Sequence, residues 1–126
     1  MERVPISSEA VPPTTSSFSQ GLRVGDLVFL AGTGGRDPRT GRLGETIEEQ
    51  TDLTIDAIEA LLAAAGCSLA DVVSCLVHLS DLSLFERYSA AYERRFPEPR
   101  PVRTTVGADL LHGMLIEVTA IARRPG

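Results

Sequence analysis

The chain has 126 residues, of which 43% are hydrophobic and 23% are charged, and its formal net charge is -5. This length predicts one domain over residues 1–126, with enough apolar side chains for a core. The acidic balance argues against nucleic acid and anionic membranes as partners, because proteins that bind phosphate groups usually carry a basic excess.

We expect no targeting signal, because the first residues lead into polar, proline-rich sequence without an apolar segment. No stretch reaches the roughly 20 apolar residues that cross a bilayer. We therefore expect a cytoplasmic protein. Cys67 and Cys75 have neither metal-ligand spacing nor a histidine cluster nearby, so no metal site is expected. Cys75 lies in an apolar run and is expected to act as a small buried hydrophobe.

The first half of the chain predicts a β-hairpin followed by a helix. Residues 3–6 form a possible strand, and prolines make residues 11–17 a loop. Residues 18–24 and 27–33 flank a Gly-Asp turn, which is typical of a hairpin. After a turn-rich segment, Thr46 and Glu49 fit a capping box at the start of a helix that Gly66 ends.

The second half predicts a strand, a helix and two further strands. The strand covers residues 72–80, and Ser83 with Glu86 offers a second capping box. That helix runs to about Phe96 and carries an aromatic stripe, which we assign to the core. Residues 102–106 and 114–122 are the last two strands. We expect structural or solvated roles for the two histidines, with His78 in a strand and His112 in the loop of a final hairpin.

These elements predict an α+β fold in which two helices cover one face of a mixed six-stranded sheet. The opposite face has no cover within the chain. Residues 27–31 are apolar on both sides of their strand, which is typical of a strand buried on both faces. The sequence therefore predicts an oligomer.

Two ionisable residues on apolar strands are candidates for a site, because burial of a charge needs a compensating partner. Arg103 begins one of the last two strands, and Glu117 lies within the other. Spacing alone also allows both side chains to face solvent. The glycine cluster at residues 32–35 lacks the setting of a phosphate-binding loop, and no Ser/His/Asp set is evident.

Along nearly its whole length the sequence resembles the RidA/YjgF family. The matching segments are FSQG at 18–21, GDLVFLAG at 25–32, DPRTG at 37–41, IEEQT at 47–51, AGCSLADVV at 65–73, PVRTTV at 101–106 and IEVTAIA at 116–122. The resemblance implies a chorismate-mutase-like homotrimer with a cleft at each subunit interface. It also implies hydrolysis of reactive enamine or imine acids to 2-keto acids and ammonia, without metal or organic cofactor.

Carried over by motif, Arg103 matches the arginine that grips the substrate carboxylate, and Glu117 matches the glutamate near the attacking water. Gly32 matches a glycine whose backbone lines the pocket, and Thr105 is expected among the substrate-binding residues. A guanidinium suits the first role because its planar fork of donors fits a carboxylate.

Three expected pocket positions differ from the family pattern. Phe18 stands where the deaminases carry tyrosine, Ala31 replaces a serine, and Ser89 aligns with an asparagine. These changes predict a less polar pocket and favour a larger or more apolar acid. Two other functions stay open: a non-catalytic trimer that binds a small carboxylate, and RNA cleavage, which the acidic balance and the lack of a nucleophile–base set disfavour.

Overall fold

The computed structural model describes residues 1–11, 13 and 17–125, so residues 12 and 14–16 of the predicted proline-containing loop lie outside the described residues. Among these residues, four strands precede the first helix, and one strand separates it from the second. The elements are β1 (Arg3–Ile6), β2 (Gly21–Val24), β3 (Leu27–Leu30), β4 (Thr33–Gly34), α1 (Ile47–Ala64), β5 (Val72–Leu79), α2 (Phe85–Glu93), β6 (Val102–Gly107) and β7 (Ile116–Arg123), with short 3-10 turns at Leu69–Asp71, Leu82–Leu84 and Leu111–Gly113.

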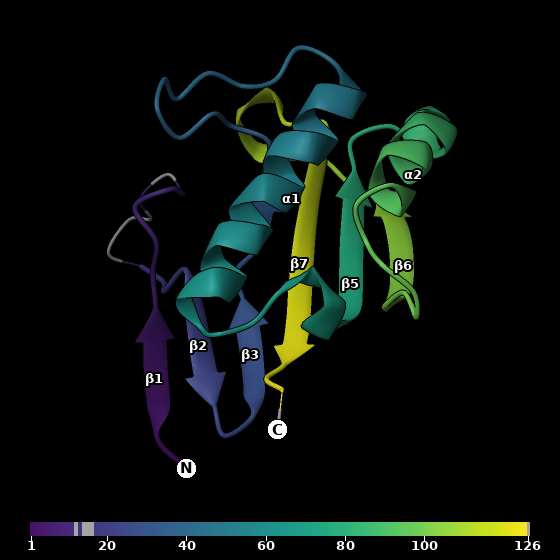
Figure 1. Cartoon of the computed structure of the whole chain (residues 1–126). Helices are drawn as coiled ribbons and strands as arrows, with labels where there is room; N and C mark the ends of the chain where they lie inside the picture. The colour runs from purple at the N-terminus through teal and green to yellow at the C-terminus, as the bar shows by residue number, and fades with distance from the viewer. Residues whose placement is uncertain (12, 14–16, 126) are drawn as a thin grey trace.

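The named strands form one sheet, and both helices pack on the same face of it (Figure 1). The strand order is β1-β2-β3-β7-β5-β6, and β4 pairs with β7 beyond the end of β3. β5 and β6 are parallel, whereas the other neighbouring strands are antiparallel. The predicted α+β class and mixed sheet are therefore confirmed.

The strand count and one connection differ from the prediction. The sheet has seven strands rather than six, because the chain leaves β3 after Leu30 and pairs again with β7 over the short β4. The predicted final hairpin is wrong, since β5 lies between β6 and β7. The connection that carries His112 therefore crosses the end of β5. Hydrophobic patterns report which residues form strands but not which strands are neighbours.

α1 begins and ends where the sequence predicts. Thr46 is the N-cap, and its Oγ1 accepts a hydrogen bond from the backbone amide of Glu49 at 3.1 Å. Gly66 follows the C-cap with φ +78, a left-handed conformation that glycine adopts without steric strain. The apolar side of the helix is fully buried against the sheet through Ile47, Ile55, Ile58, Leu61 and Leu62.

α2 differs from the prediction at both ends. Ser83 is not its cap. Asp81 instead accepts a hydrogen bond from the Ser83 amide at 2.9 Å and starts a 3-10 turn, and Leu84 then precedes α2 without a side-chain cap. The helix ends at Glu93, and the chain tightens into a turn that buries the Phe96 ring in the core. The predicted role of the aromatic stripe in the core is confirmed.

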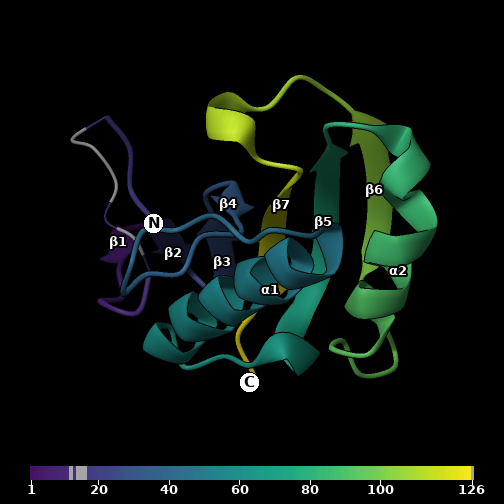
Figure 2. The same ribbon diagram turned by 90° about the horizontal axis from the view of Figure 1, so that it is seen from above.

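The face of the sheet away from the helices is partly apolar, and both helices lie on its other side (Figure 2). Phe29 is 39% exposed and Leu76 37% exposed although both lie on inner strands, whereas Val28 and Leu30 are in the core. β3 is thus apolar on both faces, as predicted. We call this surface the open sheet face; it is formed by Leu27, Phe29, Leu76, His78, Val102, Val106, Glu117 and Ile121.

Candidate functional site

Arg103 lies on β6 and points toward α2, where aromatic rings surround its guanidinium. The Arg103 Cζ atom is 5.4, 5.1 and 4.8 Å from the ring centroids of Phe85, Tyr88 and Tyr92, within the range of cation–π attraction. Its Nη1 donates to Ser89 Oγ at 3.2 Å. The structure therefore brings together Arg103 and Ser89, both predicted as site residues, and the rings hold the guanidinium in place.

The half-buried guanidinium keeps most of its hydrogen-bonding capacity for a partner from outside. It carries five N–H donors. Among the residues that the structure describes, its hydrogen bond is to Ser89 and it forms no ion pair. Arg95, by contrast, pairs with three carboxylates of α1. A partly buried cation without an internal anion is suited to binding an anionic ligand.

Thr105 lies on the same face of β6 as Arg103, because it follows two residues later. Its Oγ1 is 2.6 Å from the Tyr88 hydroxyl oxygen. Burial raises the pKa of Tyr88, so its phenol stays protonated at neutral pH. We call Ser89, Arg103 and Thr105 the arginine site. Tyr88 belongs to the core, as predicted. It also contacts the arginine site, and this contact was not predicted from the sequence.

Glu117 lies on the open sheet face, where it is the cross-strand neighbour of His78. Its carboxyl group packs on the backbone of Gly32: a Cβ atom at Gly32 would lie 2.8 Å from Glu117 Cδ and 2.9 Å from its Oε1. Real Cβ atoms do not approach so closely, so any larger residue at this position would displace the Glu117 carboxyl group. Gly32 and Glu117, both predicted as site residues, are thus in contact.

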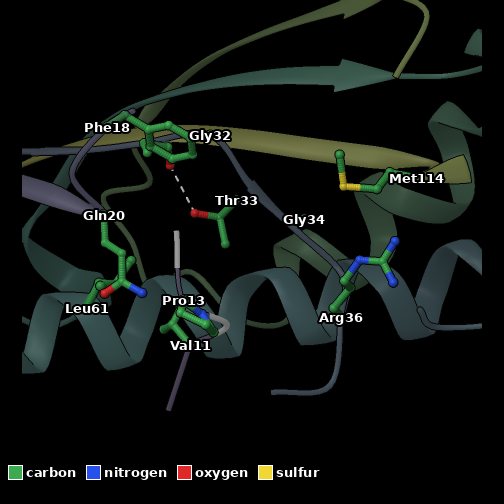
Figure 3. Close-up of a pocket in the computed structure, with 11 residues that line it drawn as sticks. Val11, Pro13, Phe18, Gln20, Gly32, Thr33, Gly34, Arg36, Leu61 and Met114 are labelled. Atoms are coloured by element: carbon green, nitrogen blue, oxygen red, sulfur yellow. Dashed lines mark hydrogen bonds between the residues drawn. The ribbon is translucent and has the colours of Figure 1, made fainter. Parts of the chain in front are cut away.

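Phe18, Ala31 and Gly32 line a cavity of about 170 Å³ between α1 and the segment that follows β3 (Figure 3). Leu61 of α1 forms part of its wall. Thr33, also in the wall, donates its hydroxyl proton to the backbone carbonyl of Ala31 at 3.0 Å. Phe18, Ala31 and Gly32 therefore share one cavity, whereas Ser89, Arg103, Thr105 and Glu117, also predicted for the site, do not line it.

The predicted site residues thus fall into two groups within one chain. Arg103 lies on the helix-covered face of β6, and Glu117 lies on the opposite face of β7. β5 lies between these two strands, so two strand spacings, or about 10 Å, separate the two residues across the sheet. Their positions on opposite faces increase this distance further. A small acid bound to Arg103 does not reach Glu117 of the same chain.

Two further side chains complete the surroundings. Cys75 is 1% exposed, as predicted, and burial raises the pKa of its thiol, which keeps it neutral and unreactive. His78 lies in β5, also as predicted, and its Nδ1 is buried without a hydrogen-bond partner in the described part of the chain. The described residues contain no cluster of His, Cys, Asp or Glu side chains that could hold a metal ion, and none of their helices is long and apolar enough to cross a membrane.

Known proteins match this chain over almost its full length. The family model described as Endoribonuclease L-PSP matches residues 8–124. A RutC family protein of Saccharolobus solfataricus is 40% identical over 121 residues, which cover 94% of this chain and 96% of the relative. The 2-iminobutanoate/2-iminopropanoate deaminase of Salmonella typhimurium is 32% identical over 123 residues, covering 94% and 96%. The crystal structure of Escherichia coli TdcF with bound serine has a TM-score of 0.90 and 26% identity, covering 96% and 98%.

The mixed sheet with one helical layer is therefore the fold of the L-PSP and YjgF proteins. The chain belongs to the RidA/YjgF family, as its sequence motifs predicted. Relatives in this family are named deaminases of reactive intermediates and of 2-imino acids.

Proposed function

We propose that this chain is an enamine/imine deaminase, which hydrolyses a reactive 2-imino or enamine carboxylic acid to the 2-keto acid and ammonia. The observation that carries the proposal is the Arg103 guanidinium, which three rings and Ser89 hold while it forms no ion pair among the described residues. Such a group is preorganised for a substrate carboxylate. The deaminase name of the Salmonella typhimurium relative and the serine bound to TdcF agree with this ligand class.

The reaction needs one water molecule and one group that handles protons. Water adds to the carbon of the protonated imine, forming a C–O bond, while the C=N electron pair moves to nitrogen. Glu117 takes the proton that the water loses and then returns a proton to the amino group. The C–N bond then breaks while the hydroxyl group on the same carbon gives its proton to Glu117 and becomes the carbonyl, so that ammonia leaves and the 2-keto acid remains. Arg103 holds the acid still, and Glu117 orients the water.

We further propose that the site lies at the interfaces of a homotrimer, because one chain separates Arg103 from Glu117. The apolar side chains of the open sheet face, such as Phe29 and Leu76, favour burial by other copies. β6, which carries Arg103, is an edge strand. If the β6 edge of one copy packs against the open sheet face of the next copy, Arg103 of the first approaches Glu117 of the second. A closed ring of three copies would repeat this contact at each interface.

The cavity suggests that the substrate is larger or more apolar than a short imino acid. Phe18 and Ala31 give it apolar walls where tyrosine and serine hydroxyls would otherwise bond a polar substrate. The same two residues favour one alternative function, a trimer that binds a small carboxylate without turnover, because they remove possible polar contacts to the reacting group.

Imines generated by an amino-acid oxidase from short, branched and aromatic amino acids test the deaminase proposal. We expect the wild type to speed the release of ammonia and keto acid above the spontaneous rate. Arg103→Ala should lower kcat/KM by about 10- to 100-fold, the worth of a charge-assisted hydrogen-bonded pair, and Arg103→Lys should restore only part of it. If the wild type adds nothing for any of these imines, the chain is not a deaminase of this class.

The binding alternative makes a different prediction. 2-Keto acids or benzoate should then raise the melting temperature of the wild type and of Glu117→Gln equally, without turnover by either, whereas Arg103→Ala should lose the effect. In a deaminase, Glu117→Gln keeps this binding but loses turnover that the wild type has.

A further inference from the structure

Two hydroxyl groups, those of Tyr88 and Thr105, form a pair beside Arg103. Tyr88 lies on α2 and is 0% exposed. Its ring packs edge-on against Phe85 and Tyr92, with centroids 5.6 and 6.1 Å apart. Arg103 Cζ lies 5.1 Å from the centroid of the same ring. The Tyr88 ring therefore has one fixed position, and so does its hydroxyl, 2.6 Å from Thr105 Oγ1.

The direction of this hydrogen bond follows from burial. A buried phenol O–H needs an acceptor, and Thr105 Oγ1 is its hydrogen-bond partner among the described residues. If Thr105 donated instead, the phenol proton would be buried without an acceptor. Thr105 is only partly buried, so its own proton has other directions available. Burial also raises the pKa of Tyr88, which keeps the phenol proton in place.

We infer that Tyr88 is a positioning residue for ligand binding: by donating to Thr105 Oγ1 it turns the Thr105 hydroxyl into a donor, which binds the ligand carboxylate together with Arg103. This inference rests on the proposed carboxylate site. A hydroxyl has one proton to donate, so fixing its acceptor side fixes where that proton can go. The chain of two hydroxyls also polarises the outer one, which strengthens its bond to an anion.

Four variants and one matched control test the inference with 2-oxobutanoate and benzoate as probes, measured by calorimetric titration. Tyr88→Phe and Thr105→Val should each weaken binding by about 3- to 10-fold, the range for one lost hydrogen bond. The double variant should bind no more weakly than Thr105→Val alone, because both changes remove the same donor. Thr105→Ser keeps the hydroxyl and should bind like the wild type.

Tyr92→Phe is the matched control. Tyr92 lies one helical turn further along α2, and its ring is also close to Arg103, at 4.8 Å. Its buried hydroxyl lies beside the Cys75 thiol and makes no hydrogen bond to the arginine site. Removing that hydroxyl should leave both affinities unchanged. A loss in Tyr92→Phe equal to that in Tyr88→Phe would mean that removing any buried hydroxyl near Arg103 weakens binding, without a specific role for the bond to Thr105, and would overturn the inference.

The test also separates this inference from the function it rests on. If Tyr88→Phe binds like the wild type while Arg103→Ala does not bind, the carboxylate site stands and the role of Tyr88 is wrong. If the losses in Tyr88→Phe and Thr105→Val add in the double variant, the two hydroxyls act separately and the inference is again wrong. Binding by Arg103→Ala as tight as that of the wild type would overturn the carboxylate site itself.

Discussion

The carboxyl group of Glu117 packs on the backbone of Gly32, so the position of a charged group depends on the absence of a side chain. A Cβ atom there would come within 2.8 Å of Glu117 Cδ. Gly32 itself is exposed, and its φ lies outside the left-handed region. The glycine is therefore needed for close approach and not for backbone conformation.

Gly32→Ala should accordingly leave the fold intact and reduce turnover. The added methyl group would push the Glu117 side chain aside, and a displacement of about 1 Å in a catalytic group costs roughly 100-fold in rate. We expect kcat for the imine substrate to fall by about 10- to 100-fold at an unchanged melting temperature. Gly32→Ala combined with Glu117→Gln should be no slower than Glu117→Gln alone. An equal further loss in the double variant would show that Gly32 acts independently of Glu117.

At this scale the sequence identified charged groups better than polar ones. Arg103 and Glu117 were recognisable because a charge on an apolar strand needs a partner. Tyr88 was not, because tyrosine in an aromatic stripe packs into a core whether or not its hydroxyl has a task. Only the coordinates place that hydroxyl 2.6 Å from Thr105.

Among the elements, α1 was predictable and the start of α2 was not. Thr46 and Gly66 are strong local signals for the ends of α1. Before α2 the sequence predicts Ser83 as the cap, but Asp81, two positions earlier, is of a residue type that caps helices equally often. The structure uses Asp81, whose carboxylate accepts the Ser83 amide proton; this bond lowers the pKa of Asp81.

The packing of α2 on β5 predicts lower stability in alkaline solution. Burial raises the pKa of Cys75, Tyr88 and Tyr92 above their ordinary values of 9.0 and 10.0. Above pH 9 the unfolded chain therefore loses protons that the folded chain keeps. The free energy of unfolding should fall as pH rises through this range, by up to about 1.4 kcal/mol per pH unit for each group.

Urea unfolding followed by circular dichroism at pH 7.5, 9 and 10.5, at constant protein concentration, measures this slope. Tyr92→Phe removes one of the titrating groups and should make the slope shallower. A free energy of unfolding that is constant or rises between pH 9 and 10.5 would contradict the burial of these groups in solution.

The whole molecule has one helix-covered face and one open sheet face, and Arg103 and Glu117 lie on opposite sides of the sheet. The apolar pattern of β3 was enough to predict that something covers the second face. It did not reveal that Arg103 and Glu117 are on different faces, because that follows from the order β7-β5-β6. Strand order depends on long-range pairing, which local periodicity does not encode.

Mixing two impaired variants tests whether the site is shared between copies. Arg103→Ala should keep at most about a tenth of the wild-type activity alone, and Glu117→Gln should lose turnover. If Arg103 of one copy works with Glu117 of the next, trimers formed from an equal mixture contain some interfaces with both native residues. In random assembly, an interface has a chance of one half of receiving native Arg103 and one half of receiving native Glu117. About a quarter of all interfaces therefore contain both native residues. We therefore expect about a quarter of the wild-type deaminase activity after the mixture is unfolded and refolded together.

The control is the same mixture without unfolding, in which trimers do not exchange and activity stays at the level of the separate variants. Light scattering should give about three times the chain mass of 13.5 kDa for each variant, because neither substitution removes an apolar side chain of the open sheet face. A site within a single chain predicts no recovery, since every chain then carries one defect. Within one chain the sheet keeps Arg103 and Glu117 apart, so one small acid can contact both residues only between two copies. Refolded trimers that stay inactive would therefore reject the shared site.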